Sequence, residues 1–135
     1  MKKNFSIDTI KRFYSLKSHK IYSLPIVILM PHSRCNCRCV MCDIWKGNNN
    51  VKQLEESDIA KMLDSFRKFN TREVVMSGGE ALMHPNFFRL CEIIKSRKIK
   101  ITLLSTGLLL KKYASEILAK TDEVIVSLDG SKEVH

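Results

Sequence analysis

The chain has 135 residues, 44% of them hydrophobic, and a formal net charge of +9 at pH 7. This length is enough for one domain with a buried core, and the longest apolar run, residues 24–30, is too short to cross a bilayer. Because a polar stretch follows Lys2 and Lys3 where a secretory signal would have an apolar segment, we expect a cytoplasmic protein without a membrane partner.

Much of the positive charge lies near the N-terminus. The cations there are Lys2, Lys3, Lys11, Arg12, Lys17 and Lys20. We interpret residues 1–22 as a basic, solvated N-terminal extension and residues 23–135 as the domain that follows it. Nucleic acid is the alternative partner for such an arm. We do not expect it, because stacking aromatic residues are not interleaved with the cations along a strand.

A dense group of cysteines follows the first predicted strand. Residues 26–30 are a continuous apolar run rich in β-branched side chains, which predicts a buried strand. The cysteines after it are Cys35, Cys37, Cys39 and Cys42. An odd total of five cysteines argues against a disulfide framework and favours a metal. Within the group, Cys35, Cys39 and Cys42 have the spacing C-x3-C-x2-C, and three thiolates can hold an iron–sulfur cube with one iron left open.

The remaining sequence alternates helices with strands. Apolar stripes at helical spacing are formed by Ile59, Met62, Leu63 and Phe66, by Phe87, Leu90, Cys91 and Ile94, and by Leu110, Tyr113, Ala114, Ile117 and Leu118. Strands are predicted at residues 73–76, 101–105 and 124–128. This order predicts an α/β fold with parallel strands and right-handed crossovers. About four βα units form a partial TIM-like (βα) barrel or an open sheet, and since a full barrel needs roughly 250 residues, we expect a truncated, poorly stable chain.

Polar residues and glycines follow each predicted strand at its carboxyl end, where parallel α/β folds bind ligands. The cysteines follow the first strand and Ser77-Gly78-Gly79-Glu80 follows the second. Thr106-Gly107 comes after the third strand, and Ser127 and Asp129 lie at the end of the fourth. These segments are therefore expected to meet at one rim of the sheet.

The cysteine spacing after a first strand, followed by Gly-Gly-Glu after a second, resembles the radical S-adenosylmethionine (SAM) superfamily. The resemblance extends from about residue 24 to residue 135. It implies that Cys35, Cys39 and Cys42 bind a [4Fe–4S] cluster whose open iron is chelated by SAM. It also implies an enzyme that cleaves SAM reductively to a 5′-deoxyadenosyl radical, which abstracts hydrogen from a substrate. An electron donor such as a flavodoxin or ferredoxin is implied as a partner. The small-molecule or peptide substrate is not readable, and the chain alone is expected to be weakly active or inactive.

The same resemblance assigns the residues that bind SAM. These are Gly78, Gly79 and Glu80 for the methionine amino group, Ser127 and Asp129 for the ribose hydroxyls, and Met41 for an adenine contact. Glycines let the backbone approach a ligand closely, and a glutamate can accept a hydrogen bond from an ammonium. A simple strand-end turn is the alternative for Ser127 and Asp129. The asparagine of the Thr-Asn-Gly element common in relatives is absent beside Thr106.

Cys37 lies between the motif cysteines, and the resemblance makes it a bystander. Two alternatives stay open, one for the site and one for the function. The whole loop is alternatively a structural zinc site, with His32, His84 and Cys91 as conceivable partners. Cys91, however, lies on a predicted apolar helical stripe, where a core role is favoured. The alternative function is a non-catalytic zinc- or iron–sulfur-binding module that contacts nucleic acid through the basic arm.

Overall fold

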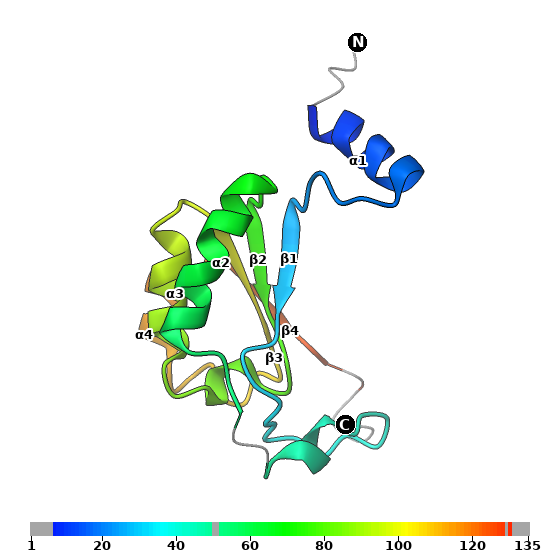
Figure 1. The fold of residues 1–135 in the computed structure, drawn as a ribbon. Coiled ribbons are helices and arrows are strands. Elements are labelled where there is room, and N and C mark those ends of the chain that lie inside the picture. Colours follow the sequence, from blue (N-terminus) through cyan, green and yellow to red (C-terminus); the bar gives the residue numbers. More distant parts are fainter. Residues whose placement is uncertain (1–6, 50–51, 129, 131–135) are drawn as a thin grey trace.

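Four short parallel strands lie side by side in the computed structural model, in the order β1-β2-β3-β4 (Figure 1). The structure describes residues 7–49, 52–128 and 130. The strands are β1 (Ile26–Leu29), β2 (Glu73–Met76), β3 (Lys100–Ser105) and β4 (Glu123–Val126). The helices are α1 (Ile7–Ser18), α2 (Glu56–Lys68), α3 (Phe87–Lys95) and α4 (Ala114–Lys120), with short 3-10 turns η1 (Ile44–Gly47) and η2 (Ala81–Met83). The predicted α/β order of parallel strands is confirmed.

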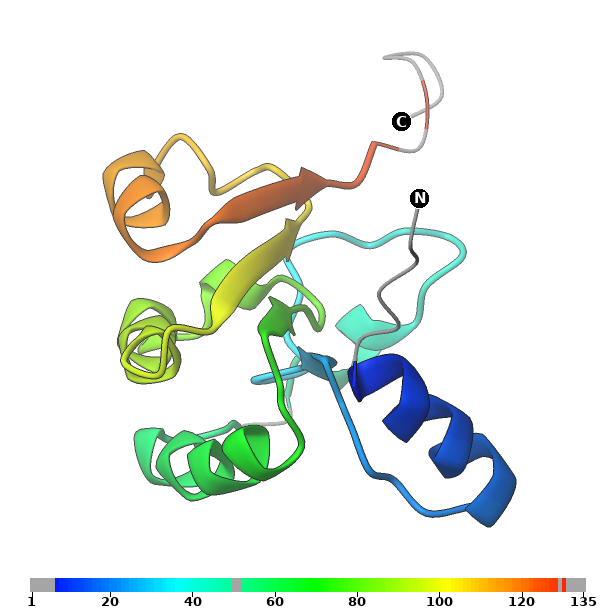
Figure 2. The same ribbon diagram turned by 90° about the horizontal axis from the view of Figure 1, so that it is seen from above.

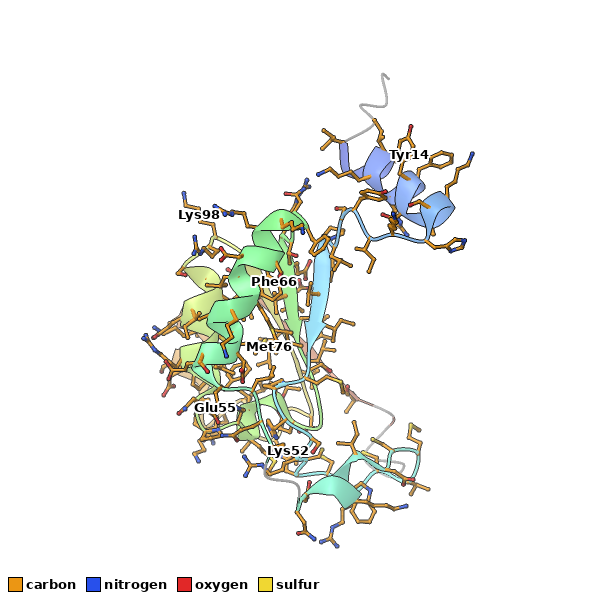
Figure 3. The ribbon with its side chains drawn as sticks, viewed as in Figure 1. Tyr14, Lys52, Glu55, Phe66, Met76 and Lys98 are labelled. Carbon is orange, nitrogen blue, oxygen red and sulfur yellow. The ribbon has the colours of Figure 1, made fainter. Side chains whose placement is uncertain are left out.

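Helices α2, α3 and α4 cover one face of the sheet (Figures 1 and 2). Side chains alternate along a strand, so Val74 and Met76 of β2 point into the layer beneath these helices, where both are fully buried. The helices contribute Ile59, Leu63, Phe66, Phe87, Leu90, Cys91, Ile94 and Ile117 to the same core. Phe66 is seen between α2 and the sheet in Figure 3. Burying each large side chain stabilises the fold by roughly 1.5–3 kcal/mol, so this layer holds the strand ends in place.

On the opposite face of the sheet, β1 is open to solvent in the described residues, whereas Thr102 of the central strand β3 is buried there. Leu29 on the helix side of β1 is 8% exposed, whereas Ile28 on the other side is 65% exposed. The prediction that residues 26–30 form a buried strand is therefore wrong for half of its side chains. β1 is an edge strand, and its second face meets no layer within the described part of the chain. All four residues of the other edge strand, β4, are exposed as well.

The last helix is shorter than its predicted stripe. α4 begins at Ala114, and Leu110 lies in the turns before it. These turns follow Gly107, whose φ of 88° reverses the chain after β3 in a conformation that favours glycine. Ile117 is buried as expected, but Leu118 is exposed and does not belong to the core. Ala114 is exposed too, so the sequence pattern identifies the helix and misplaces two residues of its buried face.

Helix α1 was not predicted from the sequence and stands apart from the sheet, at the end opposite the cysteine loop (Figure 1). Its aromatic residues Phe13 and Tyr14 are exposed, and Tyr14 is labelled on this helix in Figure 3. The turn after α1 is held by the backbone N–H of Tyr22, which donates to the Ser15 hydroxyl at 3.0 Å. Among the residues described, no helix combines the length and the apolar character that crossing a membrane requires.

Candidate functional site

The cysteine loop leaves the carboxyl end of β1 and returns through η1. Cys35, Cys37 and Cys42 are partly buried, while Cys39 is exposed. Asn48 holds the start of the loop with two hydrogen bonds. The backbone N–H of Cys35 donates to Asn48 Oδ1 at 2.9 Å, and Asn48 Nδ2 donates to the Cys35 carbonyl at 3.0 Å. The sequence alone does not single out Asn48, because an asparagine that holds a distant backbone looks the same as one in a turn.

The three predicted metal ligands share the loop but do not form a closed site. In the described parts of the chain, no group of three His, Cys, Asp or Glu side chains is close enough to hold a metal ion. The donor type nevertheless fits an iron–sulfur cluster, because all three are free thiols on one short loop and soft thiolates suit such clusters. Loading would have to bring the sulfurs together.

The loop region also contains unsatisfied polar atoms. Among described residues, the buried side-chain atoms without a hydrogen-bond partner are His32 Nε2, Ser33 Oγ and Trp45 Nε1. All three residues lie just before or just after the cysteines. An unpaired buried polar atom costs about 1–3 kcal/mol, so such atoms are expected where a segment changes its contacts on binding. This observation, like the thiol donors, fits a loop that takes up a cofactor.

Gly78 and Gly79 make room for the cysteine loop itself. Gly78 has a φ of 123°, and a Cβ on Gly79 would lie 2.2 Å from the Arg34 carbonyl oxygen and 2.8 Å from Cys35 Cβ. The backbone N–H of Glu80 donates to that same Arg34 carbonyl at 2.9 Å. The glycines were expected to admit a ligand, and in the structure they admit the backbone that leads into Cys35. The two sequence motifs are therefore in direct contact.

The Glu80 carboxylate is fully buried and joins the ends of β2 and β3. It accepts hydrogen bonds from the Leu82 N–H at 3.1 Å and from the Ser105 hydroxyl at 3.0 Å. Thr106 adds its N–H at 2.8 Å and its hydroxyl at 2.7 Å. A carboxylate has about four acceptor positions, and these donors occupy them. Glu80 thus supports the rim through its side chain, a role that sequence reasoning missed along with that of Ser105.

The remaining predicted SAM residues make few contacts with the rest of the site or lie outside the described residues. Met41 is 85% exposed on the cysteine loop. Ser127 is exposed just beyond β4, where its N–H donates to the Ser105 carbonyl at 3.0 Å. Asp129 lies outside the described residues. The structure therefore brings the cysteine loop, Gly78–Glu80 and Thr106 together, whereas the predicted contacts of Met41 and Ser127 stay predictions.

The other two cysteines have different surroundings. Burial raises the pKa of the Cys37 thiol, and a hydrogen bond with Thr106 partly opposes this. Cys91 is fully buried in the core, where desolvation raises its pKa to about 12. A thiol packed among apolar core side chains is inert and does not reach the cysteine loop. The zinc alternative loses Cys91, and both ring nitrogens of His84 are already engaged in hydrogen bonds.

A parallel sheet whose strand ends bring a cysteine loop onto a Gly-Gly-Glu turn defines an α/β protein with a candidate cofactor site at the carboxyl ends of its strands. The family model described as the Radical SAM superfamily matches residues 29–135. The chain therefore belongs to the radical SAM superfamily. Members of this family use a [4Fe–4S] cluster together with SAM, the pair of cofactors that the resemblance implied.

Named relatives are similar to this chain in sequence, and a solved structure shares its fold. A probable GTP 3′,8-cyclase of Methanococcus maripaludis is 36% identical over 99 residues, covering 71% of this chain and 33% of the relative. A GTP 3′,8-cyclase of Desulforamulus reducens is 33% identical over 106 residues, covering 72% of this chain and 32% of the relative. The chain thus spans about a third of the length of these curated relatives. Streptococcus suis SuiB, solved with bound S-adenosylmethionine, has the same fold with a TM-score of 0.64 at 24% identity, over 90% of this chain and 27% of SuiB.

Proposed function

We propose that this chain provides the cofactor-binding part of a radical SAM enzyme. The observation that carries the proposal is the contact between the two motifs: the Glu80 N–H donates to the carbonyl of Arg34, the residue before Cys35. This contact puts a three-thiol loop beside the turn that the family uses for SAM. In the proposed assignment, Cys35, Cys39 and Cys42 hold the cluster, and the rim around Gly78–Glu80 receives the methionine end of SAM.

When bound, the cluster and SAM supply one-electron cleavage of a carbon–sulfur bond, which gives methionine and a 5′-deoxyadenosyl radical that abstracts hydrogen. The protein contributes position and shielding. Gly79 lets the Arg34 carbonyl approach, and Glu80 holds Thr106 against the same turn. Because the Glu80 carboxylate is already paired, we propose that the backbone of the Gly78–Glu80 turn, more than this side chain, meets the SAM ammonium.

Cluster reconstitution tests the ligand assignment. After anaerobic reconstitution with iron and sulfide, we expect the absorption and reduced-state resonance spectra of a [4Fe–4S] cluster. Replacing Cys35, Cys39 or Cys42 by Ala should abolish both, whereas Cys37→Ala, a matched control on the same loop, should retain them. Loss of the cluster in Cys37→Ala together with its retention in Cys35→Ala would show that the ligand set is wrong.

Metal analysis separates this function from the non-catalytic alternative. Protein purified without oxygen should contain iron and sulfide in similar amounts. Stoichiometric zinc without iron or sulfide would overturn the radical SAM proposal and support a structural zinc module.

A low-potential electron donor protein, such as a flavodoxin or ferredoxin, is part of the proposal, because cleavage of SAM consumes one electron.

We propose GTP as the substrate of a protein that contains this cofactor-binding part and has the length of the curated relatives. The support is the name of the curated relatives, GTP 3′,8-cyclase, at 36% identity. The proposal is tested in a protein that extends to the length of those relatives, by measuring whether GTP accelerates formation of 5′-deoxyadenosine. If GTP has no effect while SAM cleavage proceeds, the substrate proposal fails and the cofactor proposal stands.

A further inference from the structure

Two histidines that the proposed chemistry does not use lie side by side behind the cysteine loop. His32 precedes the loop and His84 follows η2, and their ring centroids are 5.6 Å apart. His32 is 5% exposed and His84 is 3% exposed, so both rings are inside the protein. Buried polar rings are expected to have defined hydrogen-bond partners, and those partners reveal what the rings do.

The hydrogen bonds fix the protonation of each ring. His32 Nδ1 accepts the backbone N–H of Arg34 at 3.0 Å, so its hydrogen is on Nε2. His84 Nδ1 accepts the N–H of Asn86 at 3.1 Å, and its Nε2 donates to the Leu54 carbonyl at 3.0 Å. Both rings are therefore neutral, with Nδ1 as the acceptor. Burial lowers both pKa values, and for His32 the neighbouring His84 and Arg34 lower it further.

His32 acts directly on the peptide that connects the two motifs. Its Nδ1 holds the N–H of Arg34, while the carbonyl of Arg34 accepts the N–H of Glu80 at 2.9 Å. The N–H of Arg34 is thus held by His32, and the carbonyl of Arg34 is held by the N–H of Glu80 in the Gly-Gly-Glu turn. Cys35 is the next residue, so the position of Arg34 sets where the first thiol of the loop begins.

The two histidines also connect the segment before α2 to the contact between Arg34 and Glu80. The Leu54 N–H donates to the Pro31 carbonyl at 2.8 Å, beside the isolated bridge between His32 and Gln53. His84 holds the carbonyl of the same Leu54. The segment before α2 therefore braces the residues that lead into the cysteine loop, and His84 attaches this brace to the chain that follows the Gly-Gly-Glu turn.

We propose that His32 is a positioning residue that, backed by His84, sets the cysteine loop in register with the Gly78–Glu80 turn and so sets the distance between the cluster and SAM. This inference rests on the proposed function. It assigns the effect to one atom, Nδ1 of His32, and to its acceptor role toward the Arg34 N–H. Packing of the ring against His84 is secondary.

A pair of near-isosteric replacements tests the atom that is named. In His32→Asn the side-chain oxygen can occupy the Nδ1 position and accept the Arg34 N–H, whereas in His32→Gln the amide reaches the Nε2 position instead. Glutamine is closer to histidine in size, so a role in packing predicts that Gln is the better replacement. A role in positioning predicts that Asn is the better one.

The measurement is the SAM affinity of the reconstituted 135-residue chain, read from the change that SAM causes in the resonance spectrum of the reduced cluster. We expect His32→Asn to stay within about twofold of the wild type and His32→Gln to bind SAM roughly five- to tenfold more weakly, as for one lost hydrogen bond. Cluster content and the midpoint of thermal unfolding are recorded for each variant.

The outcomes separate this inference from the proposed function. If the wild-type chain takes up no cluster that responds to SAM, the proposed function fails. If the wild type responds and the two variants are equal, if Gln is the better replacement, or if neither variant folds, the positioning role is overturned. Folding and binding by Asn combined with misfolding or weak binding by Gln supports it, because only the acceptor position distinguishes the two.

Discussion

Thr106 donates two hydrogen bonds to one oxygen of Glu80, from its N–H at 2.8 Å and from its hydroxyl at 2.7 Å. Through the N–H of the same glutamate, the cysteine loop is attached at Arg34. One residue therefore connects the ends of β1, β2 and β3, with its backbone used toward one neighbour and its carboxylate toward the other. The hydrogen bonds of the Glu80 carboxylate can therefore be removed without removing its backbone N–H.

Replacing Glu80 by Gln should destabilise the fold by about 2–3 kcal/mol, since the new NH2 group faces donors where the carboxylate accepted hydrogen bonds. The loss should appear as a lower urea midpoint of the apo chain. Glu116→Gln, on the exposed surface of α4, is the control and should leave the midpoint unchanged. An unchanged midpoint in Glu80→Gln would mean that these hydrogen bonds contribute nothing to stability.

Gly79→Ala should block cluster uptake, because the added Cβ would sit 2.2 Å from the Arg34 carbonyl oxygen and push the cysteine loop away. Gly47→Ala is the matched control, since its Cβ would be 3.6 Å from Ser33 Oγ, an ordinary contact. Iron content after reconstitution is the measurement. Equal iron in both variants would contradict the close approach of the two motifs.

The apo chain should lose stability as the pH falls below about 6.5, before its carboxylates titrate. Burial lowers the pKa values of His32 and His84 from 6.5, so below that pH the unfolded chain binds protons that the folded chain does not. Stability is therefore full above 6.5 and declines as the pH falls toward the folded pKa values. Arg34 beside the rings strengthens the effect, while Glu55 opposes it at His84.

Thermal unfolding midpoints measured from about pH 7.5 to about pH 5 check this expectation. His84→Gln removes one of the two titrating rings and should flatten the decline. Asp122, whose pKa is lowered from 3.8 chiefly by its hydrogen bond with Lys95, contributes only at more acidic pH. A midpoint that is flat across this range in the wild-type chain would refute the assignment of neutral, buried histidines.

The two faces of β1 should respond differently to mutation. Leu29→Ala removes a side chain that is 8% exposed under the helices and should cost about 2–4 kcal/mol. Ile28→Thr, at a position 65% exposed on the other face, should change stability by less than about 0.5 kcal/mol. Urea unfolding of both variants is the check, and equal losses would mean that the open face is covered in solution.

The sequence predicted the parallel α/β order, the strand at residues 73–76 and the buried stripe of α3, because periodicity reports directly on which side chains meet the core. It also identified the cysteine loop and the Gly-Gly-Glu turn, since their residue types are rare in that arrangement. What it could not give is which face of β1 is covered. An apolar run has no period, so it does not distinguish a buried strand from an edge strand with one bare face.

The interactions within the site were harder to foresee for a different reason. Asn48, Ser105 and His32 act through hydrogen bonds to residues distant in sequence or to backbone groups. Such bonds depend on three-dimensional position, and no spacing in the sequence reports them. Similarly, the sequence did not indicate that Gly79 makes room for the Arg34 carbonyl, because a glycine at a rim looks the same whether a cofactor or a neighbouring loop lies beside it.

The order of the strands decides how firmly the cysteine loop is held to the sheet. Within the described residues its stem, β1, is bonded to β2 alone, whereas β2 and β3 lie in the middle of the sheet above the helices. A strand bonded along one edge is expected to detach at a lower free energy than the centre of a sheet, so within the described residues β1 is the less firmly held of the two strands that meet at the site. The thiols of Cys35, Cys39 and Cys42 thus sit on the less firmly bonded side of the site, whereas Glu80, which they meet through Arg34, is anchored on the central strands.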